Sequence, residues 1–199
     1  ACCGIPGWWI KPATMEYDLT VIGAGIHGAG VAQAAAAAGY STLVLEQYQR
    51  PGMATSSSSS KLIHGGLRYL ESAQIGLVWE CLRERRRLLQ NAPHLVKLVP
   101  FLIPVYEQTH RGPFMIRAGL SLYAMLGGKS FHPLPRSEWS LLDGLKTSGL
   151  KQVFRYYDAQ TDDQALTAAV LQSSIELGAR AELGFEFMGA TMQADGYEL

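Results

Sequence analysis

Three glycines near the N-terminus have the spacing of a phosphate-binding turn. Gly23-x-Gly25-x-x-Gly28 follows an apolar stretch, residues 18–23, and precedes an alanine-rich stretch that ends at Gly39. Between a strand and a helix, Gly23 would permit a tight turn, Gly25 would let the backbone approach a pyrophosphate, and Gly28 would let helix and strand pack closely. The helix N-terminus would offer N–H donors and partial positive charge to the phosphate oxygens.

An acidic residue follows where the ribose of a dinucleotide would lie. Glu46 ends a second apolar stretch, residues 41–46, about 20 residues after the glycines, as this fingerprint requires. Glu46 would accept hydrogen bonds from the adenosine ribose hydroxyls, and its charge disfavours the 2′-phosphate of NADP. NAD and FAD share the pattern, so it does not choose between them. A glycine-rich turn in another kind of α/β protein is the simpler alternative.

The stretch ATSSSSSKLIHGGLRYLE, residues 54–71, joins a serine run to charged and aromatic residues. A serine run is usually a flexible linker, but this one stands between a βαβ unit and an amphipathic helix. Hydroxyls and backbone N–H groups in a turn form a nest for phosphate oxygens. Arg68 offers a planar, bidentate match to a phosphomonoester, and a structural ion pair is the alternative.

The elements that position these residues predict an α/β fold. Strands 18–23, 42–46 and about 180–187 are expected to form a parallel sheet with right-handed crossovers, on which helices 28–39 and 161–178 pack. Asp162 and Asp163 are read as the N-terminus of the second of these helices. Between these elements, the pattern predicts an amphipathic helix over 72–91, an edge strand or extended segment over 96–106, a shorter helix over 113–127 and a loop over 128–150. Towards the C-terminus, the sequence predicts a strand over 179–192 and a turn at 194–196.

The bulk composition excludes several classes of protein. The 199 residues carry 17 basic and 17 acidic side chains, so no net charge favours nucleic acid. Cys2, Cys3 and Cys81 make no disulfide framework and fit a reducing compartment. No metal site is expected, and no apolar run reaches the length of a membrane span. Residues 1–14 are expected to be an unstructured tail without a secretory signal, with Met15 as the natural start.

The order of these motifs resembles flavoprotein oxidoreductases of the glutathione-reductase-2 or amino-acid-oxidase type. In them a loop like Arg50-x-Gly52-x-x-Thr55-Ser56 follows the ribose acid and wraps the phosphates of the flavin. Three segments closely resemble FAD-dependent glycerol-3-phosphate dehydrogenases: SSKLIHGGLRYLE, PFMIRAGLSLYAMLGG and the YYD–DD pattern at 156–163. The resemblance runs from about Tyr17 to the C-terminus. Two features depart from the family pattern. The family usually has Asn at the position of His27, and its serine run is usually less uniform.

The resemblance implies an FAD-binding Rossmann-like sheet and the start of a truncated substrate domain. Its expected divisions are a tail over 1–14, FAD-binding segments over 15–110 and 151–185, an excursion near substrate and membrane over 111–150, and the beginning of the substrate-domain sheet over 186–199. Contacts to the cofactor are expected from Gly23, Gly25, Gly28, Glu46, Thr55, Ser56, Ser57, Ser60, Lys61, Leu62, His64 and Gly65. Substrate contacts are expected from Arg68 and Tyr69.

Several of these residues also have an ordinary structural explanation. Lys61 would then be a solvated surface lysine, His64 a hydrogen-bonded core histidine and Tyr69 a core residue. For Gly65 and Gly66 the functional explanation is that two glycines would let the backbone come close to the flavin ring.

The implied reaction is oxidation of sn-glycerol 3-phosphate at C2 to dihydroxyacetone phosphate, with hydride transfer to the flavin N5. Family members are peripheral membrane enzymes that pass electrons to quinone, which implies a cytoplasmic enzyme on the inner face of the membrane. No catalytic base is identified, one beyond residue 199 is expected, and residues 1–199 alone are expected to be inactive. The alternatives are another flavin oxidase acting on an amine or 2-hydroxy acid, a nucleotide-binding module without catalysis, and an NAD-dependent dehydrogenase.

Two segments are candidates for membrane contact. Residues Arg83, Arg85, Arg86, Arg87 and Lys97 form a positive patch, which is either a solvated helix face or a site for anionic lipid. The apolar helix expected over 113–126 is either core or lies in the membrane interface beside Arg117 and Lys129.

Overall fold

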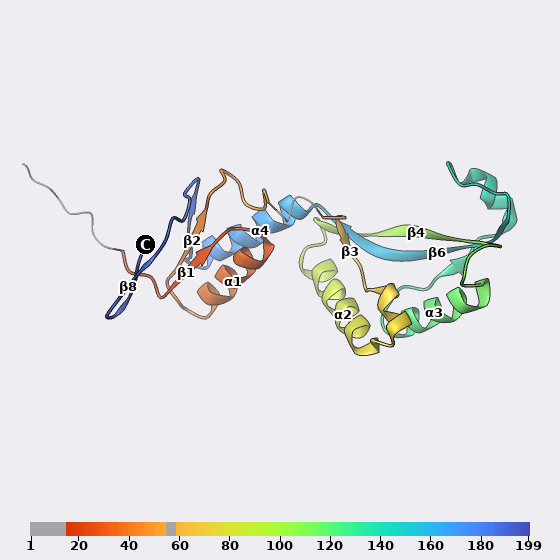
Figure 1. Ribbon diagram of the computed structural model, residues 1–199, viewed down its shortest axis with the longest axis horizontal. Coiled ribbons are helices and arrows are strands. Elements are labelled where there is room, and N and C mark those ends of the chain that lie inside the picture. The colour runs from red at the N-terminus through yellow and green to blue at the C-terminus, as the bar shows by residue number, and fades with distance from the viewer. Residues whose placement is uncertain (1–14, 55–58) are drawn as a thin grey trace, which may run out of the picture. The chain divides into compact units, whose positions relative to one another are not determined.

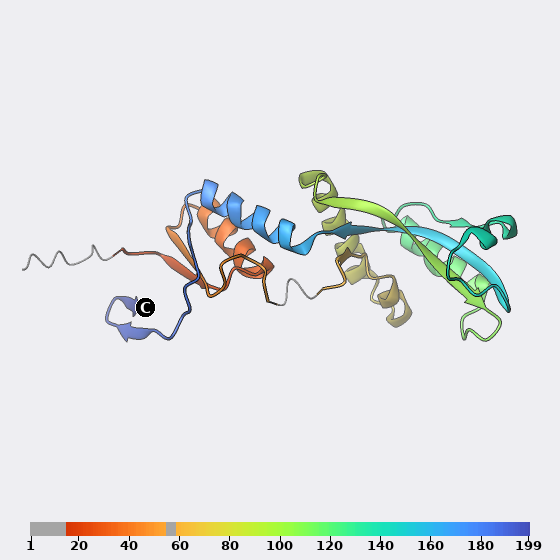
Figure 2. The same ribbon diagram turned by 90° about the horizontal axis from the view of Figure 1, so that it is seen from above.

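The computed structural model describes residues 15–54 and 59–199, which fold as two compact units (Figures 1 and 2). Unit 1 takes the chain up to residue 58 and residues 164–199, and unit 2 takes residues 59–163. The expected tail over 1–14, and Thr55, Ser56 and Ser57, lie outside the described residues. The divisions expected from the family's organisation stay a prediction.

Unit 1 is built on a parallel sheet of three strands, β1 (Leu19–Ile22), β2 (Thr42–Glu46) and β7 (Arg180–Leu183), in the order β1-β2-β7 (Figure 1). The register pairs Ile22 with Leu45 and Glu46 with Leu183. The carboxyl ends of the strands therefore meet at one edge, where the glycine turn begins. This is the predicted sheet.

Helices α1 (Ile26–Ala37) and α4 (Asp163–Glu176) pack on this sheet, as predicted, and lie side by side in both ribbon views. Gln33 Nε2 donates to Ser173 Oγ across the two helices at 2.8 Å. The buried core between helices and sheet consists of Ala24, Ala29, Ala32, Val44 and Leu171. The small alanine side chains let α1 approach the strands closely. Asp163 begins α4, so the predicted acidic N-terminus is confirmed.

Unit 2 is built on an antiparallel sheet around the long strand β6 (Leu150–Thr161). On one side β6 pairs with β4 (Val96–Tyr106), and on the other with β3 (Leu62–Ile63) and β5 (His132–Pro133). The predicted edge strand over 96–106 is confirmed as β4, whose Pro100 and Pro104 are tolerated at an edge. Strand β6 was not predicted, because its buried and exposed residues do not alternate strictly.

Two helices and a 3-10 turn lie on one face of this sheet (Figure 1). They are α2 (Ile75–Asn91), α3 (Pro113–Met125) and η2 (Leu67–Ser72). A second 3-10 turn, η3 (Arg136–Leu141), interrupts the loop predicted over 128–150. Val78, Leu82 and Tyr123 join α2 to α3, and Leu67 and Leu70 of η2 pack against them. One turn earlier on α3, Leu120 contacts Val105 and Phe154 of the sheet. Helix α3 thus links η2 to the strands.

The C-terminal segment is a hairpin of β8 (Thr191–Gln193) and β9 (Gly196–Glu198), which confirms the predicted turn. The continuous strand predicted over 179–192 is wrong, because β7 ends at Leu183. Gly184 then adopts a left-handed φ of +81°, which turns the chain out of the strand.

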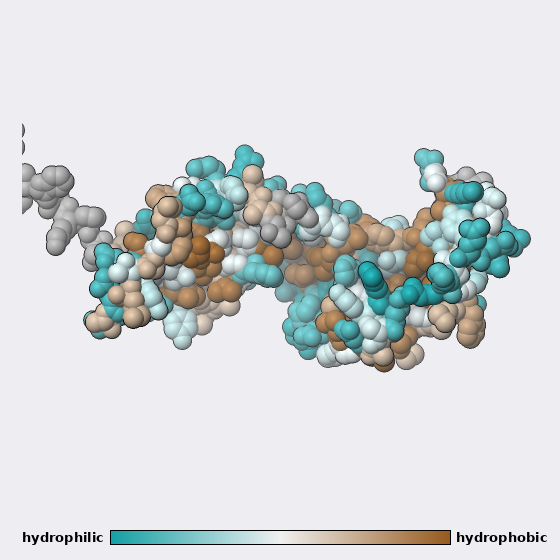
Figure 3. Space-filling view, in the orientation of Figure 1, coloured by the Kyte–Doolittle hydropathy of each residue, from teal (hydrophilic) through white to brown (hydrophobic). Residues whose placement is uncertain are grey.

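The surface of the described residues is not uniformly polar. Large hydrophobic side chains stay exposed in both units, among them Ile22, Phe114, Met125 and Met188. Figure 3 shows hydrophobic residues on the drawn face of each unit. Among the helices of residues 15–54 and 59–199, none combines the length and the hydrophobicity that crossing a bilayer requires.

Candidate functional site

The glycine turn of unit 1 has the geometry that the sequence predicts. Gly23 has a φ of +95°, a conformation that strains any other residue, and its N–H donates to Leu45 O at 2.7 Å. A Cβ atom at Gly28 would overlap the Gly23 carbonyl oxygen, so only glycine lets α1 begin this close to β1. Gly25 caps α1 in an extended conformation and makes no side-chain capping bond. The first N–H groups of a helix lack intrahelical acceptors, so this end of α1 suits phosphate oxygens.

Glu46 holds the glycine turn in place. Its side chain is buried, Oε2 accepts the Ala24 N–H at 2.6 Å, and Oε1 accepts the Tyr48 N–H at 3.0 Å. The carboxylate therefore ties the turn to the loop that follows β2. A carboxylate has about four acceptor sites, so this arrangement leaves capacity for a ribose hydroxyl. The ribose contact stays a prediction.

The loop after β2 returns to the same turn. The Gly52 N–H donates to Ala24 O at 3.0 Å, and Gly52 has a φ of +71°. A Cβ atom there would lie 3.3 Å from the Thr167 Cβ of α4. The Arg50-x-Gly52 segment is thus packed against the glycine turn. A tight turn, a close backbone approach, a helix N-terminus and a buried acid together fit the diphosphate and ribose of a dinucleotide such as FAD.

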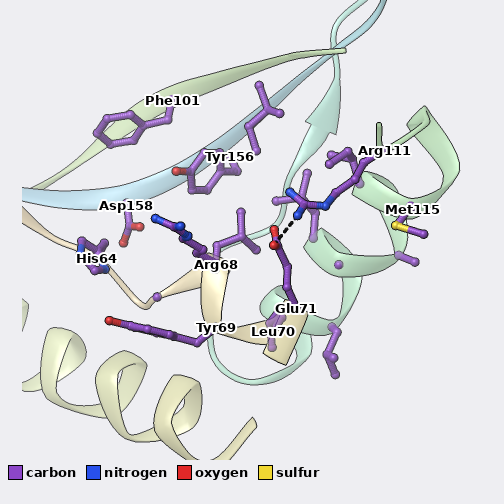
Figure 4. Close-up of a pocket in the computed structure, with 18 of the residues that line it drawn as sticks. His64, Arg68, Tyr69, Leu70, Glu71, Phe101, Arg111, Met115, Tyr156 and Asp158 are labelled. Carbon is purple, nitrogen blue, oxygen red and sulfur yellow. Dashed lines mark hydrogen bonds and ion pairs between the residues drawn. The ribbon is translucent and has the colours of Figure 1, made fainter. Parts of the chain in front are cut away.

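Unit 2 contains a pocket of about 1110 Å³ that is lined by β4, β6, η2 and α3 (Figure 4). Four of the predicted residues line it: Leu62, His64, Arg68 and Tyr69. The side chains of Arg68 and His64 make no hydrogen bond or ion pair with any residue that the structure describes. Arg68 is therefore an uncompensated positive charge at the pocket, and the alternative of a structural ion pair has no partner among these residues.

A second arginine at the pocket is already paired. Arg111 forms an ion pair with Glu71 of η2, marked in Figure 4. Much of the remaining lining is apolar, and includes Phe101, Ile103, Met115, Ile116, Leu120 and Tyr156. The pocket thus combines one free guanidinium with a largely apolar wall, a composition typical of small-molecule sites.

Beside the pocket lies a buried polar cluster of Arg85 (α2), Tyr123 (α3) and Asp158 (β6). Arg85 Nη1 donates to Asp158 Oδ1 at 2.5 Å and to the Tyr123 hydroxyl at 3.2 Å. The Tyr123 hydroxyl donates to Asp158 Oδ2 at 3.2 Å. Burial, together with the negative charge of Asp158, raises the pKa of the Tyr123 hydroxyl. The hydroxyl therefore stays protonated and remains a donor.

The expected surface patch is wrong about Arg85, which is only 3% exposed. Val78, Leu82 and Arg85 are the buried residues of α2, at a spacing of four and three residues, so helical periodicity was the signal that would have placed Arg85 inside. Nothing local in the sequence identifies Tyr123 or Asp158 as its partners. Arg83 and Arg87 both pair with Glu84 on the surface.

Gly65 and Gly66 are required by the packing of unit 2 itself. A Cβ atom at Gly65 would overlap the Leu82 side chain and the Tyr123 hydroxyl. Gly66 has a φ of +70°, and a Cβ atom there would meet the ring of Tyr69. These contacts account for both glycines without a ligand, and the approach of a flavin ring stays a prediction.

The other predicted cofactor residues of unit 2 lie at the start of β3. Ser60 and Lys61 are exposed, and Lys61 has a left-handed φ of +58°. Its carbonyl oxygen accepts the Thr161 N–H at 2.9 Å, and Leu62 pairs with Gln160 of β6. The backbone here is part of the sheet edge, and neither Ser60 nor Lys61 lines the pocket.

The class of protein follows from the chain as a whole. Residues 18–197 match the DAO family of FAD dependent oxidoreductases, so the chain belongs to this family. The predicted α/β flavoprotein fold and the predicted cofactor, FAD, are confirmed.

Relatives within the family agree with the predicted resemblance to glycerol-3-phosphate dehydrogenases. The chain is 38% identical over 193 residues to glycerol-3-phosphate dehydrogenase 2 of Mycobacterium tuberculosis, covering 94% of the chain and 33% of the relative. It is 43% identical over 162 residues to the aerobic glycerol-3-phosphate dehydrogenase of Escherichia coli, covering 81% of the chain and 32% of the relative. The chain thus spans about a third of the length of these relatives.

Solved structures show the same fold. Glycerol-3-phosphate dehydrogenase from Bacillus halodurans, complexed with FAD, matches with a TM-score of 0.64 at 24% identity, covering 92% of this chain and 29% of that one. L-alpha-glycerophosphate oxidase from Mycoplasma pneumoniae, with FAD bound, gives a TM-score of 0.64 at 16% identity, covering 92% and 49%. At these identities the likeness establishes the fold alone.

Proposed function

We propose that this protein oxidises sn-glycerol 3-phosphate to dihydroxyacetone phosphate with FAD as its cofactor. The observation that carries the proposal is the unpaired guanidinium of Arg68 at the pocket of unit 2. Identities of 38–43% to enzymes named glycerol-3-phosphate dehydrogenase support the choice of substrate.

The charges at the pocket favour a phosphomonoester. Glu71 neutralises Arg111, and Arg85 neutralises Asp158, so Arg68 is left as the net charge. Arg68 would bind two phosphate oxygens through its planar fork, and Tyr69 would add a hydroxyl donor beside it.

The chain's own residues have separable tasks toward the cofactor and the substrate. FAD, when bound, supplies the acceptor for the hydride that leaves C2. Gly23, Gly25 and Gly28 would hold its diphosphate at α1, and Glu46 would bind its ribose. Asp158 does not act as the base, because its two oxygens already accept hydrogen bonds from Arg85, Tyr123 and the backbone. No base is assigned among the described residues.

We further propose that electrons pass to quinone at the inner face of the cytoplasmic membrane. Helix α3 leaves three large apolar side chains in solvent, with Phe114 at 87%, Met115 at 60% and Met125 at 82% exposure. Arg117 lies on the same helix, and Lys129 follows it. Apolar anchors beside basic residues suit the interface of an anionic membrane. Flotation of the full-length protein with anionic vesicles tests the membrane contact, and a protein that stays in the soluble fraction contradicts it. Reduction of a soluble quinone analogue by the full-length enzyme tests the acceptor, and no reduction contradicts it.

A substrate comparison tests the main proposal. Full-length protein with bound flavin is assayed with an artificial electron acceptor on glycerol 3-phosphate, glycerol, glycine, L-proline and a 2-hydroxy acid. We expect turnover of glycerol 3-phosphate alone, and the inactivity of glycerol would show that the phosphate is needed. Because Arg68 would also bind a carboxylate, turnover of an amino acid or 2-hydroxy acid instead would overturn the substrate assignment.

A further inference from the structure

We propose that Arg85, Tyr123 and Asp158 are positioning residues that fix Gly65 and thereby set Arg68 for binding the substrate phosphate. This inference rests on the proposed function and deepens it, because it adds residues that act on the site through another residue.

The cluster contacts the backbone of residues 64–68 (HGGLR) at one atom, the Gly65 nitrogen. The Gly65 N–H donates to the Tyr123 hydroxyl at 3.0 Å and to Asp158 Oδ1 at 3.3 Å. The Tyr123 hydroxyl thus uses its one donor and both acceptor sites, toward Asp158, Arg85 and Gly65. Four elements are tied together here: α2, α3, β6 and the segment between β3 and η2.

Fixing Gly65 also fixes the start of η2, on which Arg68 lies. Gly66 follows in a left-handed conformation, and the Tyr69 N–H donates to Gly66 O at 2.8 Å. Arg68 stands between these two residues. Its backbone direction is therefore set by the turn that the cluster holds.

The cluster also decides which charge stays free. Asp158 and Arg68 both line the pocket and are drawn together in Figure 4. Asp158 is paired with Arg85 at 2.5 Å, and both side chains are 4% exposed. Asp158 is thereby engaged, so the guanidinium of Arg68 is left for an anion. Without Arg85, Asp158 would be free to pair with Arg68 and compete with the phosphate.

The test compares Tyr123→Phe with Tyr106→Phe in the full-length, flavin-loaded protein. Tyr106 is the matched control, because its hydroxyl also makes a hydrogen bond within unit 2, to Lys146 O at 2.9 Å, and it does not line the pocket. Hydrogen exchange is followed in a peptide over residues 62–71, and KM and kcat are measured for glycerol 3-phosphate.

Tyr123→Phe is expected to speed exchange in this peptide and to raise KM by about three- to tenfold, the range that one net hydrogen bond covers. The value of kcat should change less than KM. Tyr106→Phe should change neither exchange nor KM. Asp158→Asn is the second variant, and the same rise in KM is expected from it.

Two failures are distinguishable. If Tyr123→Phe folds and leaves both the exchange of residues 62–71 and KM as in the wild type, the positioning inference is overturned and the proposed function stands. If wild-type protein does not turn over glycerol 3-phosphate, the proposed function fails. The comparison of hydrogen exchange then still tests whether the cluster holds the Gly65 backbone. Unchanged exchange in Tyr123→Phe would overturn the positioning inference as well.

Discussion

At the scale of single residues, two arginines of unit 2 have opposite surroundings. Arg85 is buried and paired through Nη1 with Asp158 and Tyr123, whereas Arg68 is exposed at the pocket and has no partner among the described residues. A buried, paired arginine contributes to structure, because removing it leaves an uncompensated carboxylate. An unpaired arginine at a pocket is available for an anion. The two residues should therefore respond differently to substitution.

Replacement of Arg68 should affect the substrate more than the fold. Arg68→Ala is expected to lower kcat/KM for glycerol 3-phosphate at least about thirtyfold, which corresponds to a loss of about 2 kcal/mol of charge-assisted binding. The midpoint of thermal unfolding should change little. Arg83→Ala, which removes an exposed arginine paired with Glu84, is the control. Equal activity of the two variants would contradict the assignment of Arg68.

The buried hydroxyl of Tyr123 predicts an alkaline loss of stability. Its pKa is raised by burial and by Asp158, so above pH about 10 the unfolded chain releases this proton while the folded chain retains it. The free energy of unfolding should thus be unaffected by this group below that pH and fall above it. Urea unfolding at increasing pH measures the slope, which should be smaller in Tyr123→Phe. Some slope should remain, because burial also raises the pKa of Tyr156. An unchanged slope in Tyr123→Phe would contradict the account.

At the scale of elements, close packing at two glycines positions the glycine turn of unit 1 and the pocket segment of unit 2. Gly28 lets α1 begin against the turn at Gly23, and Gly65 lets the segment before η2 pass under Leu82 and Tyr123. In both places the glycine has no space for even one added carbon. The neighbouring glycines Gly30 and Gly76 lie in open space on helices, so each supplies a matched comparison.

At the first junction, Gly28→Ala should abolish or sharply reduce FAD binding. The new Cβ would overlap the Gly23 carbonyl oxygen, so α1 must move away from the turn that would hold the diphosphate. Gly30→Ala should leave binding unchanged. The ratio of flavin to protein after purification measures this. Equal flavin content in both variants would show that the turn does not hold the cofactor.

At the second junction, Gly65→Ala should destabilise unit 2 by about 1–3 kcal/mol, the usual cost of overpacking. Gly76→Ala should instead stabilise the protein by up to about 1 kcal/mol, because alanine is the better helix former. Chemical unfolding of the full-length protein compares the two. If Gly65→Ala left the free energy of unfolding unchanged, the side chains of Leu82 and Tyr123 would be able to move aside for the new Cβ at little cost, which would contradict the tight packing at this glycine.

At the scale of the whole molecule, the sequence predicted unit 1 better than unit 2. The strands β1 and β2 are continuous apolar runs joined by a glycine turn and an alanine-rich helix, so local pattern identified them. Strand β6 lacks strict alternation and was missed. The guanidinium of Arg68 makes it a candidate from its chemistry alone, and its role stays a prediction. Tyr123 and Asp158 come near Arg85 only through tertiary folding, 38 and 73 residues away in sequence. Such long-range partners leave no local signal.

We propose that glycerol 3-phosphate reduces a flavin bound to this protein. The most direct measurement records the flavin absorption of the full-length protein without oxygen, before and after addition of glycerol 3-phosphate. With glycerol 3-phosphate we expect bleaching near about 450 nm, where oxidised flavin absorbs, and with glycerol we expect none. A bound flavin that stays oxidised in the presence of glycerol 3-phosphate would contradict the substrate, and purified protein without flavin would contradict the cofactor.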